Sequence, residues 1–135
     1  MLFRSLLDLI EVEEKRPLSD RTLMRREGEL LLGHLRRRRK KDASSSLVIA
    51  LDERGEALDT AGLARRLAAW RASGTQELLF LIGGAQGLDS EVKAAADLVL
   101  SLGRMTWPHM LARGLLAEQL YRAQQILAGH PYHRD

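Results

Sequence analysis

The sequence contains no cysteine, and this absence excludes disulfide bonds, thiolate zinc sites and cysteine nucleophiles. It has only four histidines, so we do not expect a metal site built from histidines alone. No apolar run reaches the roughly 18 residues that a membrane span needs. The N-terminus becomes acidic at once and lacks a small-residue cleavage site, so we expect neither a secretory signal nor a membrane location. A cytoplasmic protein is the default expectation.

The composition is nevertheless that of a folded protein. Apolar residues make up 45% of the chain and charged residues 29%, which is typical of globular rather than disordered proteins. A length of 135 residues predicts a single domain, spanning residues 1–135 and large enough to bury a hydrophobic core.

Arginine dominates the charged residues. Of the 21 cationic side chains 17 are arginine. The chain has 18 acidic side chains, so its net charge is +3. The guanidinium group suits phosphate, but a GC-rich genome would give the same bias, so composition permits an RNA partner without requiring one. Residues 36–41 are six consecutive cations, more than a helix end needs, and this run favours phosphate binding without base specificity.

Strands and helices are predicted to alternate. One partly alternating strand and three continuously apolar ones are expected at residues 6–13, 47–51, 78–82 and 98–102. Helices are expected at about residues 20–35, 60–72, 91–96 and 108–128, with a turn over residues 52–59. Gly74 and Gly129 are expected to end the second and fourth helices. The pattern predicts an α/β fold with an open, mostly parallel sheet and helices on both faces.

Ligands of such sheets bind beyond the carboxyl ends of the strands. Three loops are expected there: the one that starts at Asp52, residues 83–87 and residues 103–108. Their glycines let backbone N–H groups approach a ligand. The segment GGAQG matches neither a phosphate-binding loop nor a dinucleotide fingerprint, and a tight strand-to-helix turn explains it equally well.

The C-terminal tail carries the residues best suited to catalysis. Tyr132 can stack on an unstacked base, His133 can accept a proton near neutral pH, and Arg134 can hold a phosphate. A frayed terminus is an equally good interpretation of these residues. No Ser-His-Asp or paired-carboxylate arrangement supports a hydrolase.

Four segments occur in the order and close to the spacing of a known family. They are LFLIGGAQG at residues 79–87, LGRMTWPH at 102–109, EQLYRA at 118–123 and HPYHR at 130–134. Together they resemble the RlmH family of ribosomal RNA large-subunit methyltransferases, which belongs to the SPOUT superfamily. The resemblance is specific from residue 47 to residue 135 and looser over residues 9–35.

The resemblance implies an α/β fold whose C-terminal segment is threaded into a trefoil knot. It implies a homodimer in which the partner subunit completes each site. The cofactor would be S-adenosylmethionine, and the product N3-methylpseudouridine in 23S ribosomal RNA of assembled ribosomes; no metal is implied. By position, the cofactor-binding residues would be Leu51, Gly84, Gly103, Arg104, Met105, Thr106, Trp107 and Pro108.

The tail residues acquire catalytic roles from this resemblance. N3 of pseudouridine carries a proton that must leave before or during attack on a methyl sulfonium. Our hypothesis is that His133 assists proton loss, Tyr132 positions the base, and Arg134 holds the RNA or the developing charge.

One departure from the family leaves alternatives open. Its members normally begin with a further strand and helix, and residues 1–5 are too few to supply them. Either the start is truncated or this member has lost the unit, and in both cases we expect the fold and the C-terminal catalytic half to persist. The rival functions are an RNA- or ribosome-binding protein without methyl transfer, and a SPOUT enzyme with a different RNA target.

Overall fold

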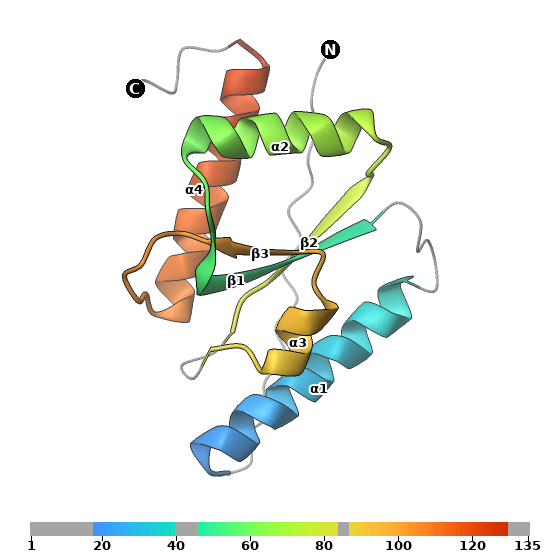
Figure 1. Cartoon of the computed structure of the whole chain (residues 1–135), viewed down its shortest axis with the longest axis vertical. Helices are drawn as coiled ribbons and strands as arrows, with labels where there is room; N and C mark the ends of the chain where they lie inside the picture. The colour runs from blue at the N-terminus through green and yellow to red at the C-terminus, as the bar shows by residue number, and fades with distance from the viewer. Residues whose placement is uncertain (1–17, 40–45, 84–86, 130–135) are drawn as a thin grey trace.

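A computed structural model describes residues 18–39, 46–83 and 87–129 of the chain (Figure 1). The strand predicted at residues 6–13 lies outside the described residues. So do the last two cations of the basic run, Lys40 and Lys41.

Three parallel strands form the sheet in this part of the chain. They are β1 (Ser46–Ala57), β2 (Glu77–Leu81) and β3 (Leu98–Ser101), in the order β2-β1-β3. Each of the three continuously apolar strands predicted from the sequence is confirmed. The central strand carries the deepest side chains, because Val48, Ile49 and Ala50 have no solvent exposure. A strand covered on both faces needs apolar residues at consecutive positions, which accounts for the unbroken run.

Helices cover both faces of this sheet (Figure 1). On one face α1 (Asp20–Arg39) and α3 (Ser90–Ala95) bury Leu35 and Val92 against Val48, Ala50 and Leu81 of the sheet. On the other face α2 (Thr60–Ala72) and α4 (His109–Leu127) form a second cluster. Its buried members are Leu63, Ala64, Leu67 and Ala123, and Leu78 of β2 packs against them. The predicted α/β architecture with helices on both faces is confirmed.

The helix ends follow local chemistry. Asp59 Oδ1 accepts a hydrogen bond of 2.6 Å from the Gly62 amide at the start of α2. Gly74 and Gly129 follow α2 and α4 with φ of 94° and 73°, the left-handed conformation that a glycine adopts freely. The predicted end of α1 at residue 35 is wrong, because the helix continues to Arg39. Arginine favours helix, and Arg38 forms an ion pair with Glu77 of β2.

The turn predicted over residues 52–59 is also wrong in extent. Leu51 and Glu56 both pair with Leu100 of β3, so the four residues between them leave the sheet and return to it within β1. We call residues 52–55 the β1 excursion. Its last residue must be glycine, because a Cβ at Gly55 would lie 2.6 Å from the Val99 carbonyl oxygen. Backbone pairing with β3 therefore continues a strand whose sequence has become polar.

Candidate functional site

The carboxyl ends of all three strands meet at one edge of the sheet, because the strands are parallel. The β1 excursion, the segment that follows β2 and the loop of residues 103–108 lie at these ends. After β2, Gly83 packs against backbone, and a Cβ there would lie 2.4 Å from the Gly87 carbonyl carbon. This edge is where a parallel sheet binds ligands.

One buried hydroxyl links two of these segments. Ser101 is the last residue of β3 and is only 4% exposed. Its Oγ lies 3.1 Å from the Glu53 carbonyl oxygen in the β1 excursion and 2.9 Å from the Gly103 carbonyl oxygen. The Gly103 amide donates a 3.0 Å hydrogen bond back to Oγ. The start of the 103–108 loop is thus joined to the excursion through one side chain.

A charged pair holds the other end of the excursion. Lys93 of α3 donates to Asp52 Oδ2 at 3.0 Å, and the Arg54 amide donates to Asp52 Oδ1 at 2.8 Å. Burial raises the pKa of Asp52, but these hydrogen bonds and the charges of Lys93 and Arg54 outweigh burial. The pKa of Asp52 therefore lies below its ordinary value of 3.8. Asp52 is a carboxylate at neutral pH and fixes the excursion to α3.

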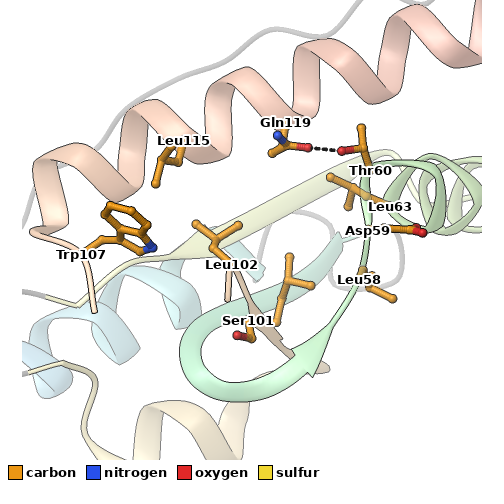
Figure 2. A pocket seen from close by; sticks show the side chains of 10 residues that line it. Leu58, Asp59, Thr60, Leu63, Ser101, Leu102, Trp107, Leu115 and Gln119 are labelled. Atoms are coloured by element: carbon orange, nitrogen blue, oxygen red, sulfur yellow. Dashed lines mark hydrogen bonds between the residues drawn. The ribbon is translucent and has the colours of Figure 1, made fainter. Parts of the chain in front are cut away.

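A pocket of about 340 Å³ opens beside the end of β3, between α2 and α4 (Figure 2). Its walls are mainly apolar, with polar groups near the start of α2, and Thr60 Oγ1 donates a 2.6 Å hydrogen bond to Gln119 Oε1 across it. The lining residues are Leu58, Asp59, Thr60, Leu63, Leu100, Ser101, Leu102, Trp107, Leu115 and Gln119. Apolar walls with a few fixed polar groups are typical of small-molecule sites.

The residues expected from the sequence to bind a cofactor are only partly brought together. Of the described members, Trp107 alone lines the pocket. Leu51 is half-buried within β1, and residues 103–108 are all exposed, with Gly103 at a φ of 122°. Gly84, Tyr132, His133 and Arg134 lie outside the described residues.

Sequence reasoning missed most of the pocket. Thr60 and Gln119 are 59 positions apart and meet only because α2 packs on α4. Ser101 did leave a signal, since it is the one polar residue in the apolar segment LVLSL. Among residues 18–39, 46–83 and 87–129, no group of three or more acidic or histidine side chains could hold a metal ion. No helix in the same ranges is long and apolar enough to cross a membrane.

Comparison with known proteins identifies the family. Residues 4–133 match the family described as "Predicted SPOUT methyltransferase". The ribosomal RNA large subunit methyltransferase H of Paramagnetospirillum magneticum is 56% identical over 126 residues, covering 93% of this chain and 78% of that protein. The proteins of the same name from Rhodospirillum centenum and Sinorhizobium fredii are 51% and 50% identical. These alignments cover 95% and 93% of this chain and 80% and 74% of the relatives. The chain therefore belongs to the SPOUT methyltransferases and, among them, to the family of ribosomal RNA large subunit methyltransferase H.

Proposed function

We propose that this protein transfers a methyl group from S-adenosylmethionine to ribosomal RNA of the large subunit, acting as one domain. One observation carries the proposal: relatives named ribosomal RNA large subunit methyltransferase H are 50–56% identical over more than nine-tenths of the chain. The loops at the carboxyl ends of the strands support it, because ligands of parallel sheets bind there.

The chemistry of these loops fits the cofactor. An adenine needs apolar walls and backbone hydrogen bonds, whereas an amino-acid moiety needs polar partners. A Cβ at Gly103 would meet no atom within 4 Å, and residues 103–108 are exposed, so the backbone of this loop is accessible to a ligand. Trp107 and Leu102 supply apolar surface beside the buried Ser101 hydroxyl. The residues proposed to hold the cofactor are Leu51, Gly84, Gly103, Arg104, Met105, Thr106, Trp107 and Pro108.

The proposed acceptor is N3 of a pseudouridine in 23S ribosomal RNA. The bound cofactor supplies a methyl group activated by its positive sulfur. Transfer would break the bond between the methyl carbon and sulfur and leave S-adenosylhomocysteine as a neutral thioether. N3 would lose its proton as it bonds to the methyl carbon, and His133 would accept that proton because an imidazole can take up a proton near neutral pH. Tyr132 stacks on the base, and Arg134 holds a phosphate or balances the negative charge that develops as the proton leaves.

The proposed assembly is a homodimer with a C-terminal trefoil knot, in which the partner subunit completes each site. Four large apolar side chains near the start of α4 support association, because burying exposed apolar surface away from water is favourable. Met105 is 71% exposed, Trp107 42%, Met110 61% and Leu111 48%. A second copy packed here would cover part of the 103–108 loop and the start of α4.

The proposed substrate is the assembled ribosome in the cytoplasm. Arg36 and Arg37 are exposed at the end of α1, beside the ion-paired Arg38. Guanidinium groups there suit RNA phosphates and add no base specificity.

The function is tested by calorimetric titration of the chain with S-adenosylmethionine, followed by transfer of radiolabelled methyl groups. The substrates are ribosomes that lack the modification, separate large subunits and free 23S ribosomal RNA. We expect saturable binding and methylation of assembled ribosomes at one pseudouridine, located by mass spectrometry of nuclease fragments. Binding without transfer to any substrate would instead indicate an RNA-binding protein, and a different methylated nucleotide would change the target.

The role of the tail is tested with His133→Ala. General-base catalysis contributes roughly 10²–10⁴-fold, so we expect kcat to fall by at least about 100-fold while the affinity for S-adenosylmethionine stays within about twofold. His130→Ala, the same change in the same tail, is the matched control and should retain near-normal turnover. Normal kcat in His133→Ala would remove His133 from the chemistry.

A further inference from the structure

The Ser101 hydroxyl occupies an unusual position at the end of β3. The residue is 4% exposed and follows Leu100, which is 3% exposed, so its side chain is polar in an apolar setting. A buried hydroxyl that lacks partners costs free energy, but this one has a partner on each side. It joins Glu53 in the β1 excursion, 48 positions earlier in the sequence, to Gly103 at the start of the loop.

The hydrogen-bond arithmetic limits what this hydroxyl can do. A serine hydroxyl has one hydrogen to donate and two lone pairs that accept. One lone pair accepts from the Gly103 amide at 3.0 Å. The single hydrogen is shared between the Glu53 carbonyl at 3.1 Å and the Gly103 carbonyl at 2.9 Å. Ser101 therefore holds Gly103, the first residue of the 103–108 loop, through both its amide and its carbonyl group.

We propose that Ser101 is a positioning residue for the cofactor, acting by holding the β1 excursion and the 103–108 loop in one fixed arrangement. The inference rests on the proposed function, because these segments flank the residues proposed to bind S-adenosylmethionine. Leu51 directly precedes the excursion, and Gly103 begins the loop. Ser101 itself need not touch the cofactor.

The loop is held at both of its ends. At its far end the Ala112 amide of α4 donates a 2.9 Å hydrogen bond to the Pro108 carbonyl, and at its near end Ser101 holds Gly103. Residues 103–108 are exposed, and Gly103 adopts a φ of 122°, which a glycine reaches without strain. Without the hydroxyl, the loop would sample more conformations in the free protein, and binding would have to restrict them. This loss of conformational freedom on binding would lower the affinity for the cofactor and leave the affinity for RNA unchanged.

The test compares Ser101→Ala with Ser101→Thr, which retains the hydroxyl. Leu35→Ala is the control, because Leu35 is a buried residue of α1 on the opposite face of the sheet. For Ser101→Ala we expect the Kd and KM for S-adenosylmethionine to rise about tenfold, equivalent to about 1.4 kcal/mol. The KM for ribosomes should not change, and hydrogen exchange of the Gly103 amide, followed by NMR, should accelerate. Ser101→Thr should restore affinity to within about threefold.

Each outcome decides the matter. Wild-type affinity in Ser101→Ala would overturn the inference, as would an equal loss in the alanine and threonine variants at equal thermal stability. If Leu35→Ala weakens cofactor binding as much as Ser101→Ala, the effect is one of global stability and the inference fails. If the unaltered chain binds no S-adenosylmethionine, the proposed function fails first. The link is then judged by the Gly103 amide alone: faster exchange in Ser101→Ala supports it, and unchanged exchange overturns it.

Discussion

Single residues at the carboxyl edge of the sheet show why their types are restricted. Gly55 and Gly83 lack positive φ values, so backbone conformation is not the reason for glycine there. At each position a Cβ would come closer than 3.0 Å to the backbone of a neighbouring segment. The absent side chain lets the excursion lie against β3 and lets Gly83 lie against the backbone of Gly87.

Asp52 gives a pH-dependent prediction at this scale. Its pKa is lower in the folded protein than its ordinary value, so its contribution to stability is present above pH 4 and is lost as the pH falls through the lowered pKa. We expect the unaltered chain to lose more stability than Asp52→Asn between pH 7 and pH 3, measured by urea unfolding at each pH. Glu91→Gln, an exposed carboxylate on α3, is the control and should retain the steeper loss. Parallel pH profiles for Asp52→Asn and the unaltered chain would contradict the prediction.

Residues with local roles were predictable, and those with distant partners were not. Gly74 and Gly129 act on neighbours within a few positions, so the sequence alone indicated their roles at helix ends. Thr60 and Gln119 have no such local signal, because their hydrogen bond depends on how two helices pack. Of the expected cofactor-binding residues, the structure places Trp107 in the pocket, and the role of the whole set stays a prediction.

At the scale of elements, α2 connects the central strand with the pocket. It begins directly after β1, and its first turn supplies Thr60 and Leu63 to the pocket wall. Arg66 on its second turn pairs with Glu56 of β1. The start of this helix is therefore held by a cap and an ion pair at the edge where the candidate site lies.

The cap of α2 can be tested directly. Replacing an N-cap aspartate by alanine costs about 0.5–2 kcal/mol, because an amide at the helix start loses its acceptor. We expect Asp59→Ala to lower Tm by roughly 2–8 °C in a calorimetric scan, given about 4 °C per kcal/mol for a domain of this size. Asp59→Ser keeps an acceptor at the same position and should lie close to the unaltered chain. An unchanged Tm in Asp59→Ala would show that the 2.6 Å bond to the Gly62 amide contributes nothing.

Element boundaries show what periodicity leaves out. The apolar run of β1 ends at Leu51, and the polar residues that follow indicate a loop when taken alone. The strand resumes at Glu56 because β3 offers backbone hydrogen bonds to it, and those are independent of side-chain polarity. Likewise α1 extends over the first arginines of the basic run. The apolar stripe ends before them, but arginine has a high helix propensity.

For the whole molecule, the alternation of strands and helices predicted the parallel sheet and the helices on both faces. The sequence did not specify that β1 lies between β2 and β3, because each apolar run fits a buried central or edge position equally well. Nor did it assign α1 and α3 to one face and α2 and α4 to the other. That assignment follows from which side chains of each strand the helices bury, as Leu35 and Val92 do against Val48.

The proposed dimer gives a prediction at this scale. A charge in an apolar interface is costly, so Leu111→Lys should convert a dimer into a monomer at micromolar concentration, measured by light scattering after size exclusion. Ala68→Lys places the same charge on the exposed part of α2 and should leave the dimer intact. Dimerisation that survives Leu111→Lys, or a monomeric unaltered chain, would exclude association through the start of α4.

The strand order also determines when each strand can pair as the chain is translated on the ribosome. Of the three strands in the described residues, the central one is made first, and both of its neighbours follow it in the chain. Ile49 pairs with Leu98, so at about 5–20 residues per second the nascent β1 waits roughly 2–10 s for its last partner. During that interval an apolar strand has an unpaired edge, and chains released before residue 98 would retain it permanently. Translation that stalls between β2 and β3 should therefore yield the most aggregation-prone fragments of this protein.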